Sequence, residues 1–423
     1  GYGLFAGRLP RVYFGNAFSR TNVDSDYVYN IGQYGPSAGP IPNLSTGAVT
    51  GITDPRFFWT RSSQSDYVYG QNGYRLYAYT HFTDPNFEGP STYKSNIALN
   101  LQFANGYDVR FEYNKDSVNK ALIWKDLSYS EEGTLADGRA LLDQRENPYL
   151  TNTGEGGGEA FSIIATKAFD NGVNLYAGYT NMEMEDASRV ASAQADSAYN
   201  KQPHDLAGEN LRAAPSDFMV DDKLIIGLDY TTQIFGTNDT RFSVLANRKS
   251  GRRYSLVYET GDSEVSITDG NWEAYDLIYV PTGVNDPNVV FASDAVASSV
   301  MNFLSSGCAA GFSGQIMTRN ACKGDYATRI DLRITQDIQV NDDQKIVIYF
   351  DIQNLMNFLD DDKGWQTEID TNSVSRAVSV DLDQTTALGQ LYITGINEDA
   401  GLIYSTDYGQ SQWQMNLGIS YKF

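Results

Sequence analysis

The sequence predicts an all-β fold, a transmembrane antiparallel up-and-down β-barrel with long loops, from three observations. The final strand alternates strictly between apolar and polar side chains, and the 423 residues include 29 Tyr, 20 Phe and 5 Trp. No run of 18 apolar residues is present, which excludes a transmembrane helix and leaves β-strands as the way to cross a bilayer. The strands of a membrane barrel alternate because one face meets lipid and the other meets the lumen.

Four pairs of alternating segments, each joined by a short turn, form the predicted hairpins. In chain order they pair 93–103 with 107–113, 159–169 with 173–180, 224–230 with 242–246, and 330–334 with 346–352. The first turn, Asn105-Gly106, is the strongest hairpin signal because both residues tolerate a positive φ. In the fourth pair, the residues expected to face the lumen are Asp331, Arg333, Asp351 and Gln353.

Two single strands complete the predicted barrel wall. Residues 1–8 form the first strand and 413–423 form the last, so the chain supplies about ten strands. The number rises to about twelve if 374–382 and 390–396 form a further hairpin of the barrel. This pair could equally be a β-structured extension of an extracellular loop.

The final strand carries its apolar side chains on one face. The residues of this face are Trp413, Met415, Leu417, Ile419, Tyr421 and Phe423, and the residues between them are polar or glycine. Successive side chains of a strand point to opposite faces, so we expect this apolar face to be directed at the membrane. A strand of a soluble β-sandwich is the alternative for such a pattern.

Long connections separate the hairpins, and they are polar and rich in Gly, Ser and Asp. They run over roughly 9–90, 128–158, 187–216, 261–324 and 359–412. Outer-membrane barrels have short periplasmic turns and long extracellular loops, so the Asn-Gly end is expected to face the periplasm. We find no internal repeat or domain linker, and we predict that residues 1–423 form one unit.

Charge and cysteine content narrow the class of protein further. The formal net charge of −22 argues against a nucleic-acid partner, which requires clustered Lys and Arg. Cys308 and Cys322 are the two cysteines, and an even number at short spacing in an exported protein predicts a disulfide. Two free thiols are the alternative. The chain opens without a signal peptide, so we expect a processed protein or the later part of a longer one.

We expect no catalytic, cofactor or metal site, and the protein is predicted not to be an enzyme. His81 and His204 are the two histidines; both fall in predicted loops, where solvated side chains are expected. Residues 154–159 are rich in Gly but lack the Lys-Ser/Thr of a phosphate-binding loop, which favours a flexible surface loop. Residues 360–362 are three aspartates, for which a charged loop is expected and calcium binding through oxygen atoms is the alternative.

The first long connection contains a dense group of aromatic residues that are candidates for ligand contact. They are Phe57, Phe58, Trp59, Tyr67, Tyr69, Tyr74 and Tyr77. Aromatic side chains supply rigid contact area for ligands such as sugars or peptides. Packing of the loop on itself over the mouth of the barrel is the alternative.

Several stretches of the chain resemble one known family. They are GYGLFAGRLPRVYFGNAFS at 1–19, NRKSGRRYS at 247–255, LIYVPTGVNDPNVVF at 277–291, RNACKGDYATRIDLRITQDI at 319–338, IYFDIQNLMNFLDDDKGW at 348–365 and GISYKF at 418–423. In this order and over essentially the whole chain, they resemble the Oar-like branch of the TonB-dependent receptors. Arg253 stands where that branch usually has a proline.

The resemblance implies a plugged barrel of about 22 strands, of which this chain would be the C-terminal ten to twelve, without plug and TonB box. It implies the outer membrane of a Gram-negative bacterium and energy-coupled uptake of an unidentified substrate. The partners would be outer-membrane lipid, the TonB complex through a missing N-terminal region, and the barrel-assembly machinery through the C-terminal strand. The alternatives are a secreted, soluble, Tyr-rich β-protein that binds glycans or surfaces, and a passive structural outer-membrane barrel.

The faces of the final strand generate the first testable prediction. We expect Phe423→Ala in the full-length protein to lower the amount found in the outer membrane, because the aromatic ring contributes roughly 1.5–3 kcal/mol of apolar burial. Asn416→Ala on the lumen face is the matched control and is expected to leave the amount nearly unchanged. Immunoblots of purified outer membranes measure both, and equal levels of the wild type and Phe423→Ala would contradict the assignment.

Overall fold

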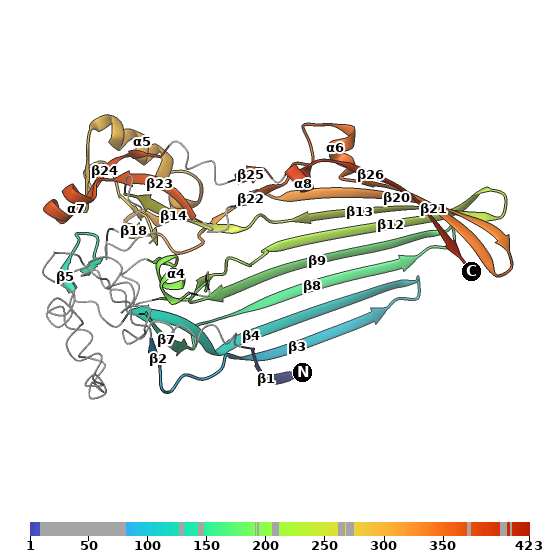
Figure 1. Ribbon diagram of the computed structural model, residues 1–423, viewed down its shortest axis with the longest axis horizontal. Helices are drawn as coiled ribbons and strands as arrows, with labels where there is room; N and C mark the ends of the chain where they lie inside the picture. The colour runs from blue at the N-terminus through green and yellow to red at the C-terminus, as the bar shows by residue number, and fades with distance from the viewer. Residues whose placement is uncertain are drawn as a thin grey trace, which may run out of the picture.

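The computed structural model describes residues 1–8 and 82–423, except for 127–130, 143–147, 191, 193, 205–210, 261–266, 268–274, 370–373, 398–403 and 407. The main sheet has thirteen strands, ten of which follow one another along its path, while three short strands, β2 (Phe82–Thr83), β7 (Pro148–Thr153) and β11 (Ala214–Pro215), pair at its side. In spatial and chain order the ten are β1 (Tyr2–Ala6), β3 (Ser91–Gln102), β4 (Tyr107–Asp126), β8 (Gly156–Ala168), β9 (Val173–Asp186), β12 (Asp222–Phe235), β13 (Asn238–Lys249), β20 (Ala327–Asn341), β21 (Gln344–Gln353) and β26 (Gln414–Lys422). Each strand pairs antiparallel with the next, which confirms the predicted all-β, up-and-down antiparallel class (Figure 1).

All four predicted hairpins are present, as β3–β4, β8–β9, β12–β13 and β20–β21. Gly106 and Gly172 adopt positive φ angles of 82° and 85° in the first two turns, as short hairpin turns require. The strands are longer than the alternating segments because pairing continues beyond the apolar part. In β4, for example, the strand runs on from Tyr113 to Asp126.

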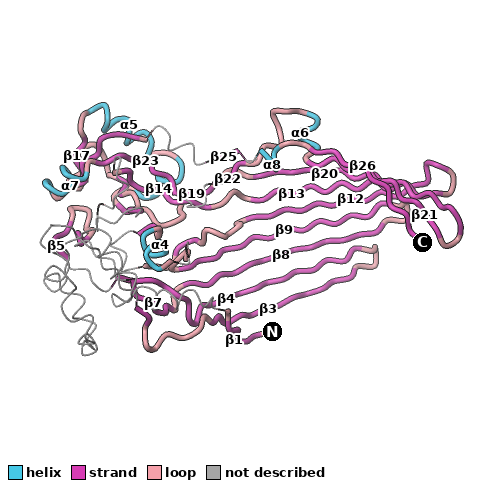
Figure 2. The backbone as a smooth tube through the Cα atoms, in the orientation of Figure 1, coloured by secondary structure: helices cyan, strands magenta, loops and turns pink. Residues whose placement is uncertain are grey.

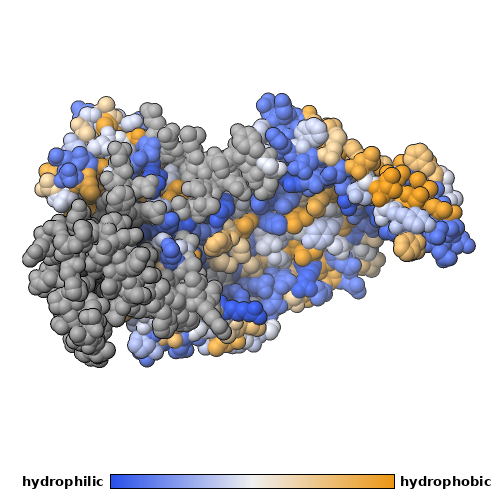
Figure 3. All heavy atoms as spheres, in the orientation of Figure 1, coloured by the Kyte–Doolittle hydropathy of each residue, from blue (hydrophilic) through white to orange (hydrophobic). Residues whose placement is uncertain are grey.

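The strand registers align the predicted apolar positions on one face of the sheet, which we call the outer face. One row of directly paired residues on this face consists of Leu99, Phe111, Ile163, Tyr179 and Leu224. The opposite, inner face is largely polar, with Asn100 paired to Arg110 and Arg333 paired to Asp351. In Figure 3, hydrophobic residues gather at the end of the sheet where β20, β21 and β26 meet. A contiguous exposed apolar face of this extent marks an interaction surface.

The same registers show that the strands are inclined. One row of directly paired residues crosses seven neighbouring strand pairs and consists of Met415, Ile352, Leu332, Val244, Leu228, Leu175, Lys167 and Tyr107. Tyr107 adjoins the short turn of its hairpin, whereas Ile352 lies eight residues from Gln344, which adjoins the short turn of its own. With the short turns at one level, the offset of eight residues corresponds to roughly 27 Å along the strands, and the six pairings correspond to roughly 29 Å across them. The strands are therefore inclined by about 43° to the barrel axis.

The incline fixes the height of the apolar band on the outer face. Allowing for the offset, Lys115, Glu159, Asp222 and Arg248 all lie about eight to ten residues above the level of the short turns. The outer face below them is largely apolar. Its polar residues include Lys167, close to the short turns, and Thr240 and Gln336, which are joined by a hydrogen bond of 2.5 Å. Nine residues at this incline span roughly 22 Å of height, close to the band of roughly 25 Å that outer-membrane barrels present to lipid.

The long connections fold into a second sheet beyond the end of the main sheet that lies opposite to the short turns (Figure 2). In spatial order its strands are β17 (Val289–Phe291), β24 (Leu391–Ile396), β23 (Val374–Val380), β14 (Arg253–Glu259) and β19 (Cys322–Lys323), and helices α5 (Asp294–Leu304) and α7 (Leu382–Leu388) pack beside them. We call these seven elements, together with the segments that share their buried apolar cluster, the cap. The pair 374–382 and 390–396 therefore forms β23 and β24 in the cap, and the main sheet has ten strands on its path.

Small elements complete the described connections. They are β2 (Phe82–Thr83), β5 (Glu131–Thr134), β6 (Ala140–Leu142), β7 (Pro148–Thr153), α4 (Ala195–Asn200), β10 (Pro203–His204), β11 (Ala214–Pro215), β15 (Tyr275–Asp276), β16 (Tyr279–Val280), η5 (Gly307–Phe312), β18 (Gln315–Ile316), α6 (Leu355–Leu359), β22 (Thr367–Ile369), β25 (Tyr404–Thr406) and α8 (Tyr408–Ser411). Among the described residues, no helix combines the length and the apolar character needed to span a bilayer.

The largest buried apolar cluster lies in the cap and not between the faces of the main sheet. Its fully buried members include Ile278, Val300, Leu304, Leu391 and Ile393. Leu135 belongs to the same cluster, so residues from three connections share one core. The cap is therefore held together as a soluble domain is, by burial of apolar side chains.

The predicted disulfide is present between Cys308, in η5, and Cys322, in β19. Their Cα atoms lie 5.1 Å apart and 14 residues separate them in the chain. Cys322 is fully buried and packs in the core of the cap. The bond lies in the connection between the third and fourth hairpins, as the sequence predicts.

The Gly-rich segment 154–159 is not the flexible loop that we expected. Gly156, Gly157 and Gly158 begin β8 and pair with β9, and the last two also pair with β4. A Cβ atom on Gly157 would lie 2.6 Å from the carbonyl oxygen of Asp116, and one on Gly156 would lie 2.8 Å from that of Glu185. Glycine is therefore required because the neighbouring backbones approach too closely for a side chain.

The position of the disulfide generates the second prediction. We expect Cys308→Ala with Cys322→Ala to destabilise the cap by roughly 3 kcal/mol through loop-closure entropy, while the main sheet keeps its resistance to denaturants. Limited proteolysis and thermal unfolding of the purified protein measure the two parts separately. Stoichiometric thiol labelling of denatured, unreduced wild type would show instead that the bond does not form.

Candidate functional site

The inner face carries a groove where β12, β13, β20 and β21 lie side by side. Its volume is about 340 Å³, and the polar side chains that line it are Asp229, Ser243, Arg329, Asp331, Arg333, Asp351 and Gln353. They include the four residues that the sequence places in the lumen-facing register of the fourth hairpin. Strand alternation thus brings together, on the inner face, the charges of two neighbouring hairpins.

The arginines of the groove are paired with carboxylates and still face open space. Arg333 donates from Nε and Nη2 to both carboxylate oxygens of Asp351, at 2.6 and 2.7 Å. Arg329 donates from Nε to Asp331 at 2.8 Å and from Nη2 to Gln353 at 3.0 Å. More than half of the Arg333 side chain is exposed. The groove is therefore a wall of ordered donors and acceptors, in which Ser243 also donates a hydrogen bond to the carboxylate of Asp229.

Two of the stretches that carry the family resemblance meet in this groove. Arg333 belongs to the stretch 319–338 and Asp351 to the stretch 348–365. The two residues are direct partners in the register of β20 and β21. Their side chains form the ion pair described above, so the two stretches are joined across the register.

A second pair of these stretches, 247–255 and 319–338, meets where the main sheet joins the cap. Arg253 donates from Nε and Nη2 to Asp221 at 3.0 and 2.8 Å and from Nη1 to the carbonyl oxygen of Asn320 at 3.3 Å. Asn320 has a positive φ of 57°, and its Nδ2 donates to the carbonyl oxygen of Pro215 at 2.7 Å. Arg319 is buried and donates to Asp186. These residues tie three segments of the chain together, which is a structural role.

The stretch 277–291 is a turn organised around one buried carboxylate. Asp286 accepts hydrogen bonds from Thr282 N (2.7 Å) and Oγ1 (2.8 Å), from Asn288 N (2.8 Å) and from Tyr279 Oη (3.1 Å). Burial raises the pKa of Asp286, but the backbone and side-chain hydrogen bonds outweigh burial and leave the pKa below its ordinary value. The polar groups of this turn satisfy one another, so the turn shapes the cap.

The candidate aromatic residues of the first long connection lie outside the described residues. Phe57, Phe58, Trp59, Tyr67, Tyr69, Tyr74, Tyr77 and also His81 belong to this undescribed part. Their role in ligand contact remains a prediction from the sequence.

His204 corrects the expectation of a solvated loop histidine. Its ring is buried, with Nε2 3.3 Å from Oδ1 of Asp276 and Nδ1 3.0 Å from the carbonyl oxygen of Gln202. The reason is that β10 pairs in parallel with β15, which draws both residues into the interior. Burial raises the pKa of Asp276, but the hydrogen bond and charge of His204 outweigh it and hold the pKa well below the ordinary range.

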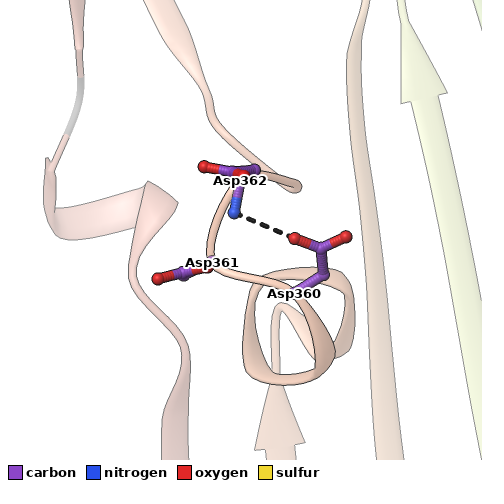
Figure 4. Close-up of side chains that lie close together, drawn as sticks. All are labelled: Asp360, Asp361 and Asp362. Carbon is purple, nitrogen blue, oxygen red and sulfur yellow. Dashed lines mark hydrogen bonds between the residues drawn. The ribbon is translucent and has the colours of Figure 1, made fainter.

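The three aspartates 360–362 form a turn directly after α6 (Figure 4). One oxygen atom from each carboxylate lies within 4.8 Å of the others. Asp360 forms an ion pair with Lys363 at 2.8 Å and accepts a hydrogen bond from Asp362 N at 3.1 Å, and these contacts lower its pKa. The turn thus has a cation of its own, and we interpret it as the charged loop that the sequence predicts.

Comparison with known proteins gives a weak likeness only. No family model and no curated protein matches the chain. Among solved structures, BauA, the ferric preacinetobactin receptor of Acinetobacter baumannii, is 11% identical with a TM-score of 0.35, covering 80% of this chain and 30% of BauA. The outer membrane transporter YddB of Escherichia coli is 10% identical with a TM-score of 0.40, covering 82% of this chain and 35% of YddB. The chain spans about a third of the length of these two proteins.

A third solved structure, the NanC porin, is 10% identical with a TM-score of 0.16, covering 62% of this chain and 81% of NanC. At these scores the likeness carries no argument of its own. The fold assignment therefore rests on the strand order, the registers and the two faces of the sheet.

The Asp286 turn generates the third prediction. We expect Asp286→Ala to destabilise the cap by roughly 2 kcal/mol, because it removes a carboxylate that accepts four hydrogen bonds in a buried turn. Asp294→Ala, at the exposed start of α5, is the control and should cost less. Since the folded pKa of Asp286 is lowered, its contribution is present above pH ~4 and is lost as the pH falls below that value. Thermal unfolding of both variants between pH 7 and pH 3 measures this; a wild type whose advantage persists unchanged at pH 3 would contradict it.

Proposed function

We propose that this chain forms part of the barrel wall of a TonB-dependent receptor of the Oar-like branch in the outer membrane of a Gram-negative bacterium. The receptor would take up a substrate in an energy-coupled manner. The observation that carries the proposal is the apolar band of the outer face, with its height of roughly 22 Å and strand incline of about 43°. Tilts of about 35–45° and a band of about 25 Å are the geometry of strands that span an outer membrane.

The inner face supports a polar passage. Its groove presents the Arg333–Asp351 and Arg329–Asp331 pairs to open space. A lumen lined in this way is wet and suits the movement of a hydrophilic solute along it. We infer that these pairs form part of the substrate path, where ion pairs can exchange partners with a passing polar group.

The cap supports a receptor more than a simple pore. Its buried core and disulfide hold the long connections in a defined shape, and a rigid surface binds a ligand with less loss of conformational entropy. On this proposal the cap faces the exterior and the short turns face the periplasm. The aromatic residues of the first long connection are our candidates for the first contact with substrate.

The edges of the main sheet bear on how the barrel closes. In the described part of the chain, β1 pairs only with β3, and β26 pairs only with β21. Unpaired backbone groups are too costly in hydrocarbon to remain exposed. We propose that further strands of a larger wall pair with both edges, that β26 is read by the barrel-assembly machinery, and that TonB acts through a region outside this chain.

Two alternatives have different consequences. A soluble, glycan-binding β-protein would leave the apolar outer face in water. A passive barrel would have the same band and groove but no coupling to the energy of the inner membrane. The fourth prediction tests the soluble alternative. Uptake by the full-length gene product, measured with and without TonB, tests the passive barrel.

The fourth prediction tests the membrane assignment with two substitutions of the same kind. Leu228 and Leu245 lie on neighbouring strands and are similarly exposed in the isolated sheet, at 41% and 47%, but they point to the outer and the inner face. We expect Leu228→Arg to destabilise the membrane-inserted protein by roughly 2–4 kcal/mol, as a charge on the lipid face near the middle of the bilayer does. Leu245→Arg is expected to have little effect.

Two quantities are measured for each variant: the amount of protein in purified outer membranes, and the denaturant concentration at which half of the full-length protein unfolds in phospholipid vesicles. Similar effects of both substitutions would contradict the membrane assignment. Recovery of the wild type in aqueous buffer without detergent, with a cooperative thermal transition, would do the same.

A further inference from the structure

A rigid apolar patch projects from the connection between β21 and β26. It consists of Phe358 and Leu359 at the end of α6, Trp365 in the following turn, and Trp413 just before β26. Leu359 is 73% exposed and Trp413 45% exposed, and Phe358 and Trp365 are also exposed. The rings of Phe358 and Trp413 meet edge to face, with 5.3 Å between their centroids. The patch therefore joins two ends of one long connection.

Two buried asparagines hold this patch in position. Asn354, at a positive φ of 53°, donates from Nδ2 to the carbonyl oxygens of Gly364 (2.9 Å) and Ser411 (2.5 Å). Asn357 donates from Nδ2 to the carbonyl oxygens of Asp361 (3.2 Å) and Lys363 (3.0 Å) and accepts from Trp413 N at 3.3 Å. Because these amides fix the backbone on both sides, the exposed apolar side chains are presented by a fixed backbone.

The position of the patch points to its partner. Trp413 continues the outer face of β26, two residues before Met415, and Met415 pairs with Ile352 at the upper part of the apolar band. With the strand offset included, Trp413 lies about eleven residues above the level of the short turns, one or two residues beyond Glu159 and Arg248. The patch is thus continuous with the lipid-facing surface and lies at its upper boundary.

The chemistry of the patch also fits a boundary between oil and water. The indole N–H of Trp365 is satisfied by the carbonyl oxygen of Asp361 at 2.9 Å, so its ring can enter an apolar phase without an unpaired donor. The charged turn 360–363 follows directly after Leu359. Tryptophan beside apolar residues on one side and charged groups on the other is the composition of membrane-interface segments.

We propose that α6, Trp365 and Trp413 form an interfacial anchor that inserts into the outer leaflet at the boundary between acyl chains and headgroups. The occupant of the patch is membrane lipid, because the patch extends the apolar band without a break and ends in charges at headgroup height. This inference rests on the proposed function, since the band must itself lie in a bilayer. The anchor adds lipid contact outside the strand ladder and fixes the height at which the last hairpin and β26 sit.

The test uses nitroxide labels on single cysteines, because both native cysteines are held in the disulfide. Leu359→Cys reports on the patch, Leu417→Cys on the apolar band, and Asp361→Cys on the charged turn two residues from Leu359. The full-length protein, with the further strands that complete its wall, is reconstituted in phosphatidylcholine vesicles, and collision of each label with oxygen and with a water-soluble nickel chelate is measured.

We expect the ratio of oxygen to nickel collision at position 359 to approach that at 417 and to exceed that at 361 several-fold. A ratio at 359 equal to that at 361, with 417 in lipid, would overturn the anchor and leave the proposed function intact. Water-like values at 417 as well would overturn the proposed function. Strong dipolar coupling between labels at 359 of two molecules in the same vesicles would assign the patch to a second copy of the chain and overturn the lipid assignment.

Discussion

The unbroken antiparallel hydrogen-bond ladder of the main sheet is the interaction on which the rest of the structure depends. Nine successive pairings connect β1 to β26, and neither face of this sheet contains the principal buried cluster. The backbone pairs therefore define the wall, and the side chains of each face are free to match a different solvent. In an apolar environment such a ladder is the condition for stability, since every unpaired peptide group there costs several kcal/mol.

The ladder also explains why the main sheet and the cap are stabilised in different ways. On the inner face, the direct register of Arg333 and Asp351 forms a bidentate ion pair without any buried core around it. Beyond the strand ends, where the ladder stops, the connections use apolar burial, a disulfide and buried polar hubs such as Asp286. Three of the segments that resemble a known family, 247–255, 277–291 and 319–338, lie wholly or partly in these connections, where their described contacts are structural.

The sequence predicts the main sheet well and the cap poorly, for physical reasons. Period-two alternation and turns such as Asn105-Gly106 are local signals, and each describes a hairpin whose partners are adjacent in the chain. The pairing of β14 with β23 is parallel and joins Ser255 to Val374, and no local pattern specifies such a contact. Helix α5 had a usable signal, because the cap residue Ser293 precedes buried residues Ala297, Val300 and Leu304 at helical spacing. The burial of His204 depends on β15, about seventy residues away, and was beyond prediction.

Within the candidate site, alternation predicts that Arg333 and Asp351 lie on the inner face. It does not predict that they pair with each other, because this depends on the register between their two strands.

The parallel pairings of the cap have a consequence for the order of assembly. Cys308 and Cys322 are close in the chain and can be joined early, whereas β14 meets β23 only after the whole of β20 and β21 lies between them in the sequence. Closing so long a loop is entropically costly unless the intervening strands are already in place. The cap therefore folds late, and it becomes resistant to proteases only after the fourth hairpin has formed correctly. A quality-control protease that cleaves an unfolded cap would therefore also remove molecules whose main sheet is misfolded.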